Sequence, residues 1–153
     1  MQIVVAETPE HIDGTRVLFR EYWESFGLTP CFQNFDREID ELPGKYAGPR
    51  GRLALAVIDG SAAGCVAIRP IDDERCELKR LYVRPEYRGK GVGLTLLMWA
   101  IAAALSCGYK EMLADTMPVM ERALDMYDRI GFERVDAYGD EPTEGAVYLR
   151  LLL

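Results

Sequence analysis

The chain has 153 residues, of which 49% are hydrophobic and 28% are charged, which is the composition of an ordinary globular protein. This length favours one domain, 1–153, with a sizeable core. The net charge of −7 argues against nonspecific nucleic-acid binding, and charge or glycine interrupts every apolar run well short of the ~18 residues of a membrane span. The N-terminal residues also lack the basic segment and apolar run of a secretion signal.

The cysteines and the single histidine argue against several further kinds of site. The four cysteines, Cys31, Cys65, Cys76 and Cys107, have no C-x-x-C spacing, so we expect reduced thiols in the cytoplasm, no disulfide framework and no metal site. The single histidine, His11, falls in an expected N-terminal helix and is predicted to face solvent. A histidine-based catalytic triad is therefore not expected.

The first half of the chain predicts a strand, two helices and a hairpin. Thr8-Pro9-Glu10 has the residues of a helix start: a capping hydroxyl, a proline in the first turn and an acid near the positive end of the helix dipole. Asp59-Gly60, between two apolar runs, is a strong hairpin signal. The expected elements are a strand over Gln2–Ala6, a helix from Thr8 to Phe26, a second helix carrying Phe32, Phe35, Ile39 and Leu42, and strands over Arg52–Ile58 and Ala62–Ile71.

The second half predicts alternating strands and helices. The helix expected over Val92–Ser106 carries leucine, tryptophan and isoleucine on nearly all sides, which predicts deep burial against a sheet. The other expected elements are strands over Cys76–Val83 and Lys110–Asp115, a helix from near Pro118 to Gly131, and strands over Phe132–Tyr138 and Ala146–Leu153 joined by the acidic loop Gly139–Gly145. The order β-α-α-β-β-β-α-β-α-β-β implies a mixed α/β fold, with helices on both faces of a six- to seven-stranded sheet.

A basic, glycine-rich loop precedes the apolar helix. Five cations and one anion fall within Lys79–Lys90, a local charge of +4, so that the remaining residues sum to −11. Gly89, Gly91 and Gly93 allow a close approach of the backbone to a ligand. Because the first turn of a helix has unpaired N–H groups and a partial positive charge, this loop predicts a site for a phosphate or pyrophosphate.

The glycine spacing decides between the known phosphate motifs. The P-loop pattern fails because Arg84 stands where its first glycine belongs, and the dinucleotide pattern fails because its third glycine would fall at Leu94. The pattern R-x-x-G-x-G does fit, with Arg88, Gly91 and Gly93. Preceded by ELKRLYVRPEY, it strongly resembles the acetyl-CoA-binding motif of the GNAT N-acetyltransferase superfamily. The segment ALDMYDRIGF resembles a second signature of that family, and the likeness extends over nearly the whole chain.

The resemblance implies how the cofactor would bind. The strand before the loop is expected to diverge from its parallel neighbour, and the backbone of Leu81, Tyr82 and Val83 to bond the pantetheine arm of acetyl-CoA. The N–H groups of the loop are expected to hold the pyrophosphate, with Lys90 as an added cation. The loop residues are Arg88, Gly89, Lys90, Gly91, Val92 and Gly93. Met120 replaces an asparagine that often contacts the pantetheine arm, which weakens the contact expected there.

The resemblance also implies two catalytic residues. Glu77 matches the strand glutamate that acts as general base; alternatively it pairs with Lys79 or with a cation on the neighbouring strand. Tyr127 matches the tyrosine that protonates the coenzyme A thiolate; alternatively it is a core aromatic at helical spacing. Asp115 and Thr116 either bind the acceptor, assist as base or cap the following helix.

We therefore predict an acyl-CoA-dependent N-acyltransferase that transfers acetyl from acetyl-CoA to a primary amine of a small molecule or peptide, by direct attack in a ternary complex. The charge of −11 outside the loop leans toward a cationic acceptor. An alternative from another class is a non-catalytic acyl-CoA-binding sensor, which would keep Arg88–Gly93 without needing Glu77 or Tyr127; a third is a nucleotide-dependent enzyme. Homodimers are common among the proteins that the chain resembles, so a homodimer is one option for an oligomeric state that the sequence does not fix.

Overall fold

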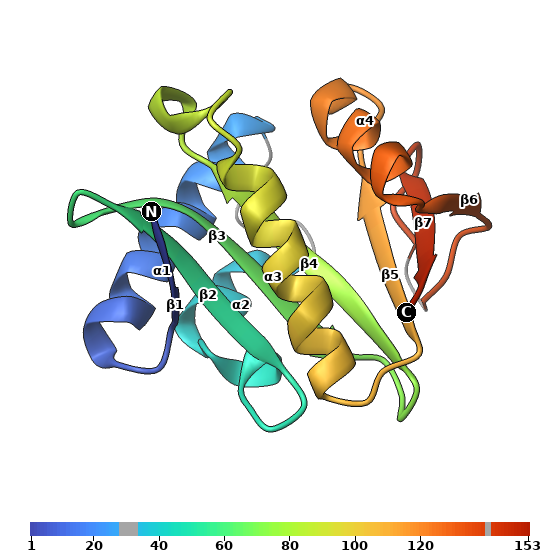
Figure 1. The fold of residues 1–153 in the computed structure, drawn as a ribbon, viewed down its shortest axis with the longest axis horizontal. Helices are drawn as coiled ribbons and strands as arrows, with labels where there is room; N and C mark the ends of the chain where they lie inside the picture. Colours follow the sequence, from blue (N-terminus) through green and yellow to red (C-terminus); the bar gives the residue numbers. More distant parts are fainter. Residues whose placement is uncertain (28–33, 140–141) are drawn as a thin grey trace.

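The protein is a seven-stranded mixed sheet with α1 and α2 on one face and α3 and α4 on the other (Figure 1). The computed structural model describes residues 1–27, 34–139 and 142–153. The strands follow the order β1-β2-β3-β4-β5-β7-β6. The elements are β1 (Gln2–Val5), α1 (Pro9–Ser25), α2 (Phe35–Asp40), β2 (Arg52–Ile58), β3 (Ser61–Pro70), β4 (Arg75–Val83), α3 (Val92–Ser106), β5 (Glu111–Thr116), α4 (Glu121–Ile130), β6 (Glu133–Val135) and β7 (Val147–Leu152). This confirms the predicted order and fold class.

Helix α1 begins as its sequence predicts. The Thr8 hydroxyl accepts a hydrogen bond from the N–H of His11 at 3.2 Å, and Pro9 occupies the first turn. The Trp23 ring packs on Phe35 of α2, with 4.5 Å between ring centroids. His11 is half-buried with its Nδ1 covered, which corrects the expectation that it faces solvent. Phe32, predicted for the second helix, lies outside the described residues.

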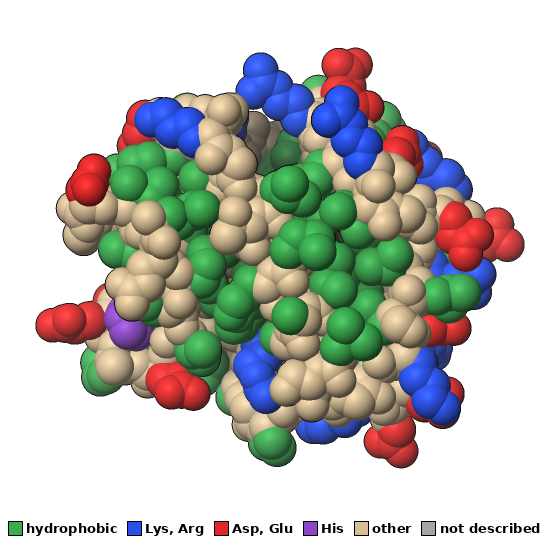
Figure 2. All heavy atoms as spheres, in the orientation of Figure 1, with side chains coloured by type: hydrophobic (Ala, Val, Ile, Leu, Met, Phe, Trp, Pro, Cys, Tyr) green, Lys and Arg blue, Asp and Glu red, His purple; other side chains and the backbone are tan. Residues whose placement is uncertain are grey.

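Helix α3 has the predicted bounds but not the predicted burial. Its side toward the sheet, which carries Leu96 and Leu97, is fully buried. Its other side leaves Leu94, Met98 and Leu105 exposed at 45%, 48% and 54%. Apolar side chains gather over this side of the molecule (Figure 2). The predicted deep burial therefore holds for the side toward the sheet and fails for the other side, because the sheet covers only one side of the helix.

Strands β4 and β5 pair at one end and separate at the other. They run in parallel from Arg75–Leu78 beside Glu111–Ala114. Beyond that point the β4 segment 79–83 pairs with β3, and the β5 segment 115–116 pairs with β7. The sheet therefore has an opening between the carboxyl ends of two parallel strands, where α/β folds place their ligands. The resemblance implied an opening at this strand.

A bulge in β4 changes which side chains reach the α1/α2 face. The register against β3 shifts between Cys65 and Ala67, and Arg80 has a φ of 58°. Because the bulge adds one residue, both Lys79 and Arg80 project toward α1 and α2 instead of alternating across the sheet. This strand therefore delivers two successive cations to one face.

Candidate functional site

A cavity of about 370 Å³ lies at the opening between β4 and β5. Its walls come from α1, β4, the end of β5, the start of α4 and the loop before β7. The lining residues are Tyr22, Trp23, Phe26, Leu78, Lys79, Arg80, Leu81, Asp115, Thr116, Met117, Val119, Met120, Ala123, Tyr127, Thr143 and Glu144. The structure therefore brings Leu81, Asp115, Thr116 and Tyr127 together, whereas Glu77, Tyr82, Val83 and the glycine loop lie outside this lining.

The glycine loop presents free backbone donors at the start of α3. Gly91 is the residue that precedes the helix, with a φ of 80°, and no side chain caps this end. The first helical bond runs from the N–H of Thr95 to the carbonyl of Gly91 at 3.0 Å, so the N–H groups of Val92, Gly93 and Leu94 have no partner within the helix. These donors and the helix dipole suit an anion, as the sequence predicted.

Two arginines fix this loop against the strand. The N–H of Arg84 bonds the Ala63 carbonyl on β3, so the carbonyl of Val83 points to the other side of β4. That carbonyl accepts a hydrogen bond from Nε of Arg88 at 2.8 Å. The Arg84 side chain pairs with Glu21 of α1, with its Nη2 2.9 Å from Oε2. The Arg84 side chain therefore ties the loop to α1, and the Arg88 side chain holds it at the edge of the opening.

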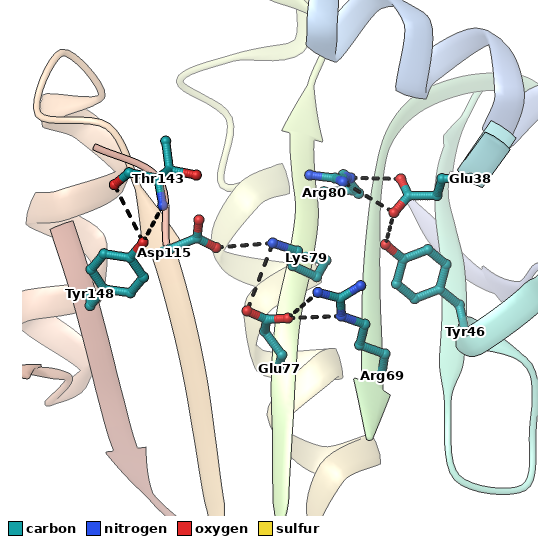
Figure 3. A network of polar contacts seen from close by, with 9 residues as sticks. All are labelled: Glu38, Tyr46, Arg69, Glu77, Lys79, Arg80, Asp115, Thr143 and Tyr148. Carbon is teal, nitrogen blue, oxygen red and sulfur yellow. Dashed lines mark hydrogen bonds and ion pairs between the residues drawn. The ribbon is translucent and has the colours of Figure 1, made fainter. Parts of the chain in front are cut away.

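Glu77 is locked in a buried ion-pair group. Only 5% exposed, it accepts hydrogen bonds at Oε1 from Nε and Nη2 of its cross-strand neighbour Arg69, at 2.8 and 2.7 Å. Its Oε2 lies 3.8 Å from Nζ of Lys79. Both pairings that the sequence offered for this carboxylate are present (Figure 3).

Lys79 joins Glu77 to the cavity. Its Nζ donates to Oδ1 of Asp115 at 3.1 Å, which connects β4 to β5 across the opening. Asp115 lines the cavity, and its Oδ2 has no cationic partner among the residues that the structure describes. Of the two candidate bases, Asp115 is therefore the one that a bound molecule can reach directly.

Arg80 forms a second buried pair, which the sequence analysis missed. Its Nε and Nη2 donate to Oε2 and Oε1 of Glu38 at 2.8 and 3.1 Å, and its guanidinium carbon lies 4.7 Å from the Trp23 ring centroid. The Tyr46 hydroxyl donates to the same carboxylate at 2.6 Å. Burial raises the pKa of Glu38, but the Arg80 charge and these hydrogen bonds outweigh it, so the net pKa is lowered. An arginine within a strand was the only local signal.

Tyr127 is buried in the cavity wall with its phenol kept neutral. Burial raises its pKa well above the usual value, and the nearby Tyr22 and Asp115 raise it further. Burial raises the pKa of Tyr22 as well, and the Arg80 charge opposes that effect. Tyr22, from α1, also escaped the sequence analysis, because only the packing of α1 on β4 reveals that it lines the cavity.

Comparison with known proteins identifies the family. The model of the acetyltransferase (GNAT) family matches residues 15–132. An uncharacterized N-acetyltransferase of Schizosaccharomyces pombe is 36% identical, over 99% of this chain and 94% of its own length. The chain belongs to the GNAT acetyltransferase family. Two solved structures share the GNAT fold. An acetyltransferase from Streptococcus agalactiae superposes with a TM-score of 0.83 and 21% identity, over 99% of this chain and 98% of its own. The PaiA N-acetyltransferase of Thermoplasma acidophilum, in complex with coenzyme A, superposes with a TM-score of 0.77 and 20% identity, over the full length of both chains.

Within this GNAT chain, the described residues combine two kinds of site. One end of the opening carries backbone donors, at the start of α3. The other end is a cavity with buried charges and phenols. Within the described part of the chain, no group of three or more histidine, cysteine or acidic side chains could hold a metal ion, and no helix is long and apolar enough to cross a membrane.

Proposed function

We propose that this GNAT protein transfers an acetyl group from acetyl-CoA to a primary amine of a small molecule or peptide, by direct attack in a ternary complex. The observation that carries the proposal is the opening between β4 and β5, which has anion-binding backbone donors at one end and the cavity with Asp115 and Tyr127 at the other. A thioester placed along this opening would have its phosphates on the glycine loop and its reactive carbon in the cavity.

The residues present fit coenzyme A at three points. The β4 edge at Leu81–Val83 has no β5 partner, so its outward N–H and C=O groups, apart from the Val83 carbonyl that Arg88 occupies, can bond the amides of the pantetheine arm. The Arg88 N–H already bonds the Pro85 carbonyl, but the N–H groups of residues 89–93 can hold the pyrophosphate, and Lys90 adds an exposed cation. The Thermoplasma acidophilum protein, which has the same fold, was crystallised in complex with coenzyme A, and this supports the choice of cofactor.

The chemistry requires two proton movements. Bound acetyl-CoA supplies the thioester, whose carbonyl carbon bonds to the amine nitrogen as the C–S bond breaks and the thiolate is protonated. The acceptor arrives as an ammonium and must lose a proton before attack. Glu77, by resemblance, or Asp115, by its position in the cavity, takes that proton. Burial raises the pKa of Tyr127, so its hydroxyl stays protonated and can donate to the leaving thiolate, where the resemblance implies its role as acid.

Thiol release in the presence of acetyl-CoA and a panel of amines tests this function. We expect Tyr127→Phe to lower kcat by ~10²–10⁴-fold while acetyl-CoA still raises the melting temperature. Asp115→Asn and Glu77→Gln separate the two candidate bases, because the variant that lacks the base loses kcat with a changed pH profile. Binding of acetyl-CoA without turnover of any amine would instead support the non-catalytic sensor.

A further inference from the structure

The buried and half-buried charges beside the cavity are nearly all paired, and the exceptions point to a ligand. Three carboxylates (Glu38, Glu77, Asp115) meet three cations (Arg69, Lys79, Arg80) in the described part of the α1/α2 face. Figure 3 shows Lys79 extending toward Asp115 and Arg80 toward Glu38. These pairs occupy both oxygens of Glu38, and Arg69 and Lys79 account for both oxygens of Glu77.

Within these pairs, two polar ends remain without an opposite charge among the described residues; the exposed Glu144 also lines the cavity. They are Oδ2 of Asp115, whose Oδ1 is taken by Lys79, and Nη1 of Arg80, whose Nε and Nη2 are taken by Glu38. Both residues line the same cavity. Lys79, which lines it as well, has donor capacity beyond its bond to Asp115. The cavity therefore offers an anionic and a cationic group to one bound molecule.

The geometry points to an amino carboxylate as the acetyl acceptor: a small molecule that carries its primary amine and a carboxylate together. Its ammonium would bind Asp115, and its carboxylate would bind Arg80 and Lys79. This inference rests on the proposed function and narrows its acceptor. A polycation such as a polyamine is disfavoured, because each additional ammonium would enter beside two buried cations. The acidic charge of the whole chain is not concentrated at this site.

The aromatic residues of the cavity wall indicate which kind of side chain the acceptor carries. Tyr22 and Trp23 of α1 and Phe26, directly after it, line the cavity on the side of Arg80, and the Tyr22 and Phe26 rings pack with centroids 4.8 Å apart. Apolar rings exclude water from the Arg80 charge, which strengthens its attraction for a carboxylate. They also favour an apolar side chain on the acceptor.

In this complex Asp115 takes one proton from the bound ammonium. The freed nitrogen forms the N–C bond to the acetyl carbon as the C–S bond breaks. The second nitrogen proton leaves with amide formation, so that the thiolate and the solvent together receive two protons. No oxidant, reductant or further reactant is required.

Matched acceptors test the inference on the unaltered protein. We would measure kcat/KM for the standard amino acids, and for leucine and phenylalanine beside their decarboxylated amines and their amides. We expect the amino acids with apolar side chains to be the best acceptors, and kcat/KM to fall about 10- to 100-fold when the carboxylate is removed or amidated, the value of one charged hydrogen-bonded contact. The amine is more basic than the amino acid and the amide less basic, so a loss with both cannot come from the amine pKa.

A variant of Arg80 tests whether this side chain causes the preference for a carboxylate. Arg80→Lys keeps a cation for Glu38 but removes the planar fork, and should reduce the preference for the carboxylate, measured as the kcat/KM ratio of amino acid to amine. Equal or better acetylation of the decarboxylated amines by the wild type would overturn the inference and leave the proposed function standing. So would turnover of no amino acid while acetyl-CoA still raises the melting temperature. If the protein turned over no amine and acetyl-CoA did not raise its melting temperature, both the inference and the proposed function would be overturned.

Discussion

Both faces of the sheet carry an apolar core, but only the face under α1 and α2 also carries buried charges. Strand β4 sends Cys76 and Leu78 into an apolar layer beneath α3 and α4, and sends Glu77, Lys79 and Arg80 into a charged layer beneath α1 and α2. All buried charged residues of the described chain belong to this strand segment. Burying charges costs free energy that ion pairing only partly offsets, so apolar side chains at these positions would stabilise the fold more. Because apolar side chains hold both faces together, we infer that the charged group within the α1/α2 layer is kept for chemistry.

Breaking a buried pair should have the largest effect on stability. Glu38→Gln leaves the Arg80 charge buried without a full partner, and we expect a loss of about 3–5 kcal/mol in the free energy of unfolding, measured by urea denaturation. Glu74→Gln, in an exposed pair with Lys110, is the control and should cost under about 1 kcal/mol. Glu38→Met combined with Arg80→Met should recover much of the stability while abolishing any preference for carboxylated acceptors. If the double variant were as unstable as the single one, the charged layer would be structural.

Truncating the apolar layer should cost stability without touching the charges. Leu96→Ala removes a fully buried side chain of α3, and we expect a loss of about 2–5 kcal/mol. Leu105→Ala, on the exposed side of the same helix, should change stability by no more than about 0.5 kcal/mol. A large loss at Leu105 would mean that its side is covered in solution, and gel filtration would then show whether a second copy covers it.

Alkaline pH should weaken the fold gradually through groups that are buried in their neutral form. Burial raises the pKa of the Cys76 thiol to about 12 and also raises the pKa of Tyr127. Because the unfolded thiol ionises near pH 9 and the folded one does not, stability is complete below pH 9 and falls as the pH rises toward 12, by at most about 1.4 kcal/mol per pH unit for each group. Urea denaturation at pH 8 and pH 10 measures the slope. Cys76→Ala should flatten it, and an unchanged slope would contradict the assignment to this thiol.

Local sequence features predicted the elements well because their causes are local. The Thr8 cap, the Asp59-Gly60 turn and the glycine after α4 act on their own neighbours, and the structure confirms each boundary within a few residues. The glycine loop was predictable for the same reason. The spacing of its glycines specifies positive φ at Gly89 and Gly91.

The contents of the cavity were less predictable because they depend on contacts between distant segments. Glu38 meets Arg80 across 42 positions of sequence, and the bulge that turns Arg80 toward it leaves no mark in the hydrophobic pattern. Strict alternation of side chains along β4 would have placed Arg80 on the face of the sheet under α3. The exposed side of α3 was misjudged for a related reason: apolar composition shows what a helix can bury but not what covers it.

The central claim is that acetyl-CoA binds along the opening with its phosphates at the start of α3. The most direct measurement is the melting temperature with and without saturating acetyl-CoA, in the wild type, in Gly91→Trp and in Gly108→Trp. Both glycines have φ near 80–86° and open space at the Cβ position, so both variants carry the same backbone strain, at opposite ends of α3. At a hundredfold excess over Kd, binding should add about 2.7 kcal/mol, which is roughly 5–11 °C for a protein of this size. The account predicts this rise in the wild type and in Gly108→Trp and its loss in Gly91→Trp. A well-folded wild type with no rise, or an equal rise in Gly91→Trp, would contradict it.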